Sequence, residues 1–98
     1  MEIVLAANQV SKIAEILAQY APEGWTALKM HLVTDETHTE VSTWAEAKTT
    51  PKHGFVLDDG DRATLDELVD AAWESSSRSW NSLDLSVTAD GEYEIDAQ

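Results

Sequence analysis

The chain has 98 residues, of which 19 are acidic and 6 basic, for a formal net charge of −13. This length predicts one domain, residues 1–98, with a single hydrophobic core. The charge disfavours binding to nucleic acid or to an anionic membrane, since both require positive potential. There are no cysteines, so disulfides and thiolate zinc sites are excluded. No apolar run is long enough to span a membrane, and the N-terminus lacks the basic region of a signal peptide, so we expect a cytoplasmic protein.

The first predicted element is a helix over residues 3–20. Apolar residues recur there at helical spacings of three, four and seven, namely Ile3, Val10, Ile13, Ala14, Leu17 and Tyr20. In a shorter alternative, Asn8 caps the helix and residues 3–5 form an extended lead-in. Pro22 and Gly24 end the helix in either case. We expect the apolar stripe to face the core.

Residues 25–45 predict a β-hairpin. In the first strand, Trp25–Val33, one face carries Thr26, Leu28, Met30 and Leu32, and the other carries Trp25, Ala27, Lys29, His31 and Val33. Residues 34–36 form the turn. The second strand, Thr37–Ala45, alternates in the same way, and its solvent-facing set is His38, Glu40, Ser42 and Trp44. Trp44 is either a packing residue of the sheet or a contact residue for a partner.

Residues 46–61 combine a loop, a short strand and an acidic turn. The loop extends to Gly54, and the apolar run Phe55–Leu57 predicts a third strand. The following Asp58-Asp59-Gly60-Asp61 does not satisfy the calcium-loop pattern of EF-hands. It predicts a solvated turn before a helix, because acidic residues are favoured at the positive helix N-terminus. The three aspartates could also form a second, independent patch for a partner.

A second helix is predicted from Thr64 to about Ser77. Thr64 and Glu67 have the spacing of a capping box. The predicted buried stripe is Leu65, Leu68, Val69, Ala72 and Ser76, with Trp73 at its border.

Residues 80–96 predict a second hairpin. Leu83, Leu85 and Val87 alternate with Asp84, Ser86 and Thr88. Asp90-Gly91 provides the turn, because glycine accepts a positive φ without steric cost. The second strand continues the apolar face with Tyr93 and Ile95, and the polar face with Glu92, Glu94 and Asp96.

The residues that usually carry catalysis lack the required spacing. His31, His38 and His53 form no zinc-binding helical motif, and the serines near Arg78 have no neighbouring histidine or nucleophile elbow. His31 and His38 could face each other across the first hairpin and bind a metal with Glu40, but ordinary exposed cross-strand polar residues are the favoured interpretation. We therefore expect no enzyme, no cofactor and no metal site.

The stretch from Trp80 to Asp96, with its tryptophan, alternating apolar residues, Gly-Glu-Tyr turn and acidic end, resembles the closing motif of the YezG-like immunity proteins. The rest of the chain resembles the family only in the order of its elements: Gly24-Trp25 follows the first helix, and a helix comes just before Trp80. Two features depart from the family: the chain is shorter than typical members, and it lacks the Tyr-Asp tail often found after this motif. The resemblance implies a small cytoplasmic antitoxin that binds and neutralises a secreted toxin, often a nuclease. The toxin's identity does not carry over, since one scaffold serves unrelated toxins.

We therefore expect an α+β domain in which two helices pack on one face of an antiparallel sheet of four or five strands. The expected function is that of an immunity protein, monomeric in its complex, whose cognate toxin has a basic cleft suited to nucleic acid or a nucleotide cofactor. The alternative is an acidic adaptor or chaperone-like module for a basic secreted protein. The candidate partner-binding residues are Trp44, Glu40, Asp84, Glu92, Glu94 and Asp96, with Asp58, Asp59 and Asp61 as the second patch.

Overall fold

The computed structural model describes residues 5–35 and 37–98, and within these it contains two helices and five strands. In chain order the elements are α1 (Ala7–Ala18), β1 (Trp25–Thr34), β2 (Thr39–Ala47), β3 (His53–Phe55), α2 (Asp59–Ser75), β4 (Ser82–Thr88) and β5 (Tyr93–Ala97). All neighbouring strands are antiparallel, in the order β3-β2-β1-β4-β5. The predicted α+β class is thus confirmed, with five strands in the sheet.

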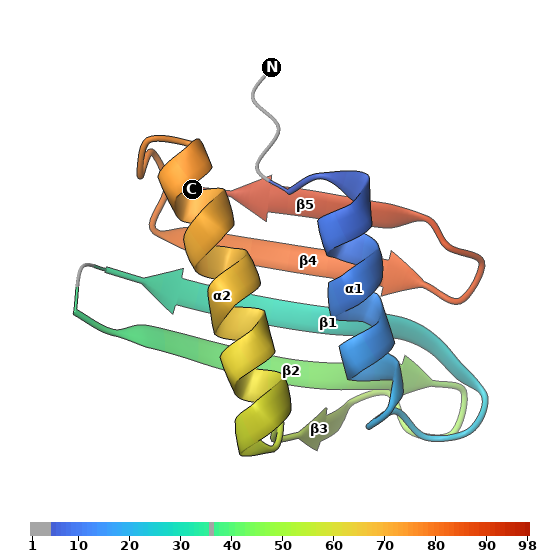
Figure 1. Ribbon diagram of the computed structural model, residues 1–98. Helices are drawn as coiled ribbons and strands as arrows, with labels where there is room; N and C mark the ends of the chain where they lie inside the picture. The colour runs from blue at the N-terminus through green and yellow to red at the C-terminus, as the bar shows by residue number, and fades with distance from the viewer. Residues whose placement is uncertain (1–4, 36) are drawn as a thin grey trace.

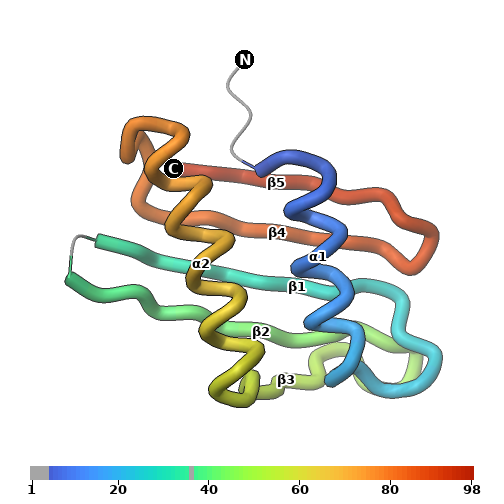
Figure 2. Tube along the Cα trace, in the orientation of Figure 1, coloured from blue at the N-terminus to red at the C-terminus, as the bar shows by residue number. Residues whose placement is uncertain are grey.

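Both helices cover the same face of the sheet, so the molecule has two layers (Figure 1). The tube view gives the same arrangement, with β3 and β5 at opposite edges (Figure 2). The core lies between the layers, because apolar side chains from one face of each strand meet the apolar stripes of the helices. Its fully buried members include Ile13, Leu17, Leu28, Leu32, Leu65, Val69 and Leu83. In the described part of the chain, neither helix combines the length and apolarity that a membrane span requires.

The first helix is shorter than predicted, spanning Ala7–Ala18. Its N-cap is Ala6, so the alternative cap at Asn8 is wrong. Alanine has no side-chain acceptor, but the side chain of Gln9 reaches back, and its Oε1 accepts the N–H of Ala6 at 2.8 Å. The predicted start at Ile3 lies outside the described residues, as does residue 36 of the first predicted turn.

An irregularity at the start of β1 changes the face on which Trp25 lies. The pairing with β2 shifts between Trp25 and Ala27, which interrupts the strict alternation of side chains. Trp25 packs against the core, whereas Thr26 is exposed and donates its hydroxyl to the carbonyl of Glu46 at 3.1 Å. The predicted faces of these two residues are therefore wrong, and the alternation predicted for Leu28 onward is confirmed.

The third strand is His53–Phe55, two residues earlier than predicted. After Phe55 the chain leaves the sheet, so Val56 is 89% exposed while Leu57 returns to the core. Two contacts hold Phe55 in place: its carbonyl accepts the Thr43 hydroxyl at 2.8 Å, and its ring stacks on Tyr20 with 5.3 Å between centroids.

Asp58 caps α2, and the predicted capping box at Thr64 is wrong. The Asp58 carboxylate accepts the N–H of Asp61 at 2.8 Å, so the helix begins at Asp59, more than a turn before Thr64. Thr64 lies inside the helix and donates its hydroxyl to the carbonyl of Gly60. Asp59 and Asp61 fall in the first turn, where the helix dipole favours negative charge.

A buried hydrogen-bond network joins the end of α2 to the chain before β4. The Trp80 indole N–H donates to the Ser76 hydroxyl oxygen at 2.7 Å, and the Trp73 indole N–H donates to the Trp80 carbonyl at 2.7 Å. Ser77 and Arg78 adopt positive φ values of 56° and 55°, which turns the chain back toward the sheet. Trp73 is 8% exposed and so lies in the core, not at its border as predicted.

Candidate partner-binding face

The side of the sheet away from the helices carries no covering element in the described chain (Figure 1). We call it the open face, and it presents side chains from four strands. They are Lys29, His31 and Val33 of β1, Glu40, Ser42, Trp44 and Glu46 of β2, Ser82, Asp84 and Ser86 of β4, and Glu94 and Asp96 of β5.

Strand register arranges the open face in rows of directly opposed residues. One row runs Trp44, Lys29, Ser86, Glu94 across β2, β1, β4 and β5. The next runs Ser42, His31, Asp84, Asp96. Since directly opposed Cβ atoms are about 5 Å apart, these rows bring together side chains that are distant in sequence.

A shallow hollow of about 550 Å³ lies along the first row and includes Asp84 and Asp96 of the second. Its polar lining consists of Lys29, Trp44, Asp84, Ser86, Glu94 and Asp96. An aromatic side chain therefore lies at one end and carboxylates of β4 and β5 at the other, which suits a partner with both basic and apolar groups.

The carboxylates of the open face differ in whether a lysine or histidine side chain contacts them. Asp84 is 2.6 Å from the Nδ1 atom of His31, and Glu46 is 3.9 Å from the ammonium of Lys29. Glu94 and Asp96 form no ion pair with any residue in the ranges 5–35 and 37–98. Asp96 is also directly opposite Asp84, where like charges repel each other. At the β5 end of the hollow, the negative charges are therefore the least balanced by other described side chains.

Trp44 lies half-buried on the open face, and its ring carries a cation–π contact. The Lys52 ammonium is 4.6 Å from the ring centroid. This contact leaves both predicted interpretations of Trp44 in place: the ring packs on the strand surface, and it also lines the hollow.

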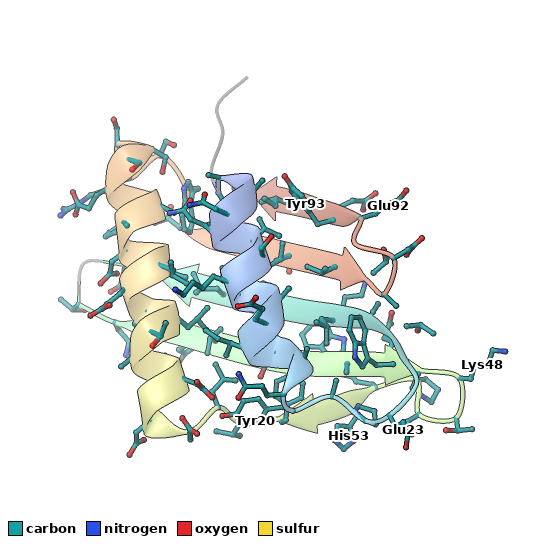
Figure 3. All side chains as sticks on the ribbon, turned by 45° about the vertical axis from the view of Figure 1, so that its right-hand side comes forward. Tyr20, Glu23, Lys48, His53, Glu92 and Tyr93 are labelled. Atoms are coloured by element: carbon teal, nitrogen blue, oxygen red, sulfur yellow. The ribbon has the colours of Figure 1, made fainter. Side chains whose placement is uncertain are left out.

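The other predicted site residues are not all brought to the hollow. Glu40 lies on the open face, where its carboxylate is 3.2 Å from Nε2 of His38. Glu92 is exposed in the turn before β5, outside the strand (Figure 3). Of the predicted open-face set, Trp44, Asp84, Glu94 and Asp96 line the hollow. Glu40 lies farther along β2, opposite Val33, and Glu92 lines a neighbouring hollow with Ser86 and Glu94.

The second acidic patch lies at the start of α2, and contacts within the fold account for two of its members. Asp58 caps the helix, and Asp61 accepts the phenol hydroxyl of Tyr20 at 2.7 Å. The Asp58 N–H donates to the same phenol oxygen at 2.9 Å, which lowers the pKa of Tyr20. The hydrogen bond to Asp61, burial and the two negative charges outweigh it and raise that pKa above its ordinary value. These contacts agree with the predicted helix-start role, and partner binding by this patch stays a prediction.

The predicted histidine pair does not form. His31 is directly opposite Ser42, and His31 and His38 each contact a different carboxylate. In the described ranges, no group of three or more histidine, aspartate or glutamate side chains is placed to hold a metal ion.

Sequence reasoning missed Lys29, Ser86 and Lys52 as members of this site. Alternation had already placed Lys29 on the same face as His31, but only the strand register shows that it lies between Trp44 and Ser86. Lys52 comes from the loop before β3, and no sequence pattern connects it to Trp44.

Comparison with known proteins yields no family assignment. The sequence matches no protein-family model and shows no significant similarity to a curated protein. The resemblance to YezG-like immunity proteins therefore stays a prediction.

Proposed function

We propose that this protein is an immunity protein that binds and neutralises a cognate toxin through the open face of its sheet. The observation that carries the proposal is the uncovered face itself. It combines Trp44, a hollow, and the carboxylates Glu94 and Asp96, which form no ion pair with any described residue. Tight protein interfaces commonly pair a few aromatic anchors with a polar rim.

The charge of the molecule supports a basic partner. With a net charge of −13 the protein attracts a positively charged protein over long distances and speeds their encounter. A toxin that acts on nucleic acid or on a nucleotide cofactor must hold a polyanion, so its cleft is basic. The open face offers such a cleft negative charge and an aromatic contact at once.

Co-expression tests the proposal. Cells that produce the protein encoded next to this one should be protected when this chain is present and killed when it is absent. Failure to protect, with both proteins produced and folded, would refute the proposal. Binding without protection would favour the acidic adaptor instead.

Two sets of variants place the activity on the open face. Trp44→Ala combined with Glu94→Gln should abolish protection, because truncating an interface aromatic commonly weakens binding by about 2 kcal/mol or more. A matched control changes Glu67→Gln on α2, an exposed carboxylate in the helix layer, and should protect normally. If both variants lost protection equally, the open face would not be the toxin-binding surface.

A further inference from the structure

The outer side of β5 is an edge of the sheet that no element of the described chain covers. This strand pairs with β4 on one side only and spans Tyr93–Ala97. At the opposite edge, β3 has just three residues and follows Pro51 closely. An unpaired edge presents backbone N–H and C=O groups that can pair with a further strand.

The ladder with β4 determines which backbone groups of β5 point outward. Ser82 and Gln98 exchange both of their backbone hydrogen bonds, each at 2.9 Å. Antiparallel pairs alternate, so the residues two and four positions earlier, Asp96 and Glu94, also bond inward to β4. The N–H and C=O groups of Tyr93, Ile95 and Ala97 therefore face the open edge.

The side chains beside this edge differ between the two faces of the sheet. On the open face stand Glu94 and Asp96, which have no ion pair in the described chain. On the helix side stand Tyr93, which is 43% exposed, and Ile95, which is half-buried against the core. Figure 3 shows Tyr93 at the start of this outermost strand. A strand added here meets carboxylates on one face and apolar groups on the other.

We propose that β5 binds an extended segment of a protein partner by strand addition, and that this segment alternates basic and apolar residues. Its basic side chains lie on the open face beside Glu94 and Asp96, and its apolar side chains lie beside Tyr93 and Ile95. The choice of a basic occupant rests on the proposed function, in which the partner is a basic toxin. Main-chain hydrogen bonds provide the affinity of such an interaction, and alternate side chains provide its specificity.

The same carboxylates argue against a second copy of this chain as the occupant. If two β5 strands paired, Glu94 and Asp96 of one copy would lie near those of the other, and like charges on neighbouring strands repel each other. Acidic residues at this edge thus oppose self-association and still admit a basic strand.

A designed peptide tests the site without any toxin. The probe is a short, end-blocked peptide of alternating lysine and valine, titrated into the full-length protein and followed by amide NMR. The amide signals of Tyr93, Ile95 and Ala97 should shift, and hydrogen exchange at these three amides should slow. Shifts confined to other strands would overturn the proposal.

Two controls separate strand addition from plain charge attraction. The same peptide with methylated backbone nitrogens on its pairing side keeps every charge, and it should bind more than about tenfold more weakly because it has lost its donors. Equal affinity for both peptides would overturn the proposal. In the protein, Glu94→Gln with Asp96→Asn should weaken binding about threefold to tenfold, since each removes an exposed ion pair. Glu67→Gln with Asp70→Asn makes the same charge change on α2 and should have a smaller effect; an equal effect would also overturn it.

The outcome is independent of the test of the proposed function. A protein that binds the alternating peptide at β5 but fails to protect cells would retain the edge site and lose the immunity role. A protein that protects cells but binds both peptides equally would retain the role and lose the edge site.

Discussion

The buried bond between Trp80 and Ser76 should contribute measurably to stability, and Ser76→Ala removes its acceptor. Ser76 is 1% exposed and Trp80 is 3% exposed, so water cannot readily replace the lost oxygen. An unsatisfied buried donor costs about 1–3 kcal/mol. Taking about 2 kcal/mol, we expect the melting temperature to fall by roughly 8–16 °C for a domain of this size.

A double-mutant cycle isolates this hydrogen bond from the other effects of each substitution. Trp80→Phe removes the donor and some volume, but it keeps the backbone carbonyl that accepts the Trp73 indole N–H. The Ser76 hydroxyl also keeps a partner, because it lies 2.9 Å from the Ala72 carbonyl. In the Trp80→Phe background, Ser76→Ala should therefore lower the free energy of unfolding only slightly. The coupling energy between Trp80 and Ser76 should then be about 1–2 kcal/mol.

Urea unfolding followed by circular dichroism provides the free energies of unfolding. Ser75→Ala is the matched control, since Ser75 is exposed at the end of the same helix and should change stability by less than about 0.5 kcal/mol. If the costs of the two single variants simply add in the double variant, the bond does not contribute as argued.

Two further predictions concern individual contacts, and a third concerns the net charge. Asp58→Ala should lower the free energy of unfolding by about 1 kcal/mol through loss of the α2 cap, and a value no larger than that for Asp59→Ala in urea unfolding would contradict the capping role. The N–H and hydroxyl of Thr37, together with the N–H of His38, hold the pKa of Asp35 below its ordinary value, with desolvation opposing them. Because the pKa of Asp35 is lower in the folded state, the Asp35 carboxylate stabilises the fold at a pH above its unfolded pKa, and this stabilisation is lost as the pH falls through the folded pKa. Asp35→Ala should therefore destabilise the protein at neutral pH, and the melting temperatures of the variant and the parent should converge in acid. Association with the basic partner should slow on the order of tenfold between low and high salt in stopped-flow mixing, and a rate independent of salt would refute electrostatic steering.

The order and type of the main elements could be predicted from local pattern alone. Strict alternation in β4 fixes which side chains share a face, so Leu83 and Asp84 had to lie on opposite sides of the sheet. The helical stripe of α1 likewise required a covered surface, and its members Ile13 and Leu17 are fully buried. These features depend on backbone periodicity, which the sequence displays directly.

The boundaries that were predicted wrongly involve neighbouring local signals that compete, and contacts between residues far apart in the sequence. Thr64 and Asp58 both offer a helix cap, and Asp58 is used because the helix extends back over Asp59 and Asp61. Phe55 is the last residue of β3, and its ring stacks on Tyr20, which follows α1 and is far from Phe55 in the sequence. No local pattern can rank such alternatives.

The sequence by itself determined that this protein is an acidic domain with a polar and an apolar face on its strands. Only the tertiary structure decided the strand order, and with it the candidate site. By placing β1 in the centre, the fold puts Lys29 between Trp44 and Ser86, and it places β5 at the edge, where β4 is its only partner strand among the described residues. Strand order depends on long-range pairing and on how the helices cover the sheet, and neither produces a periodic pattern in the sequence.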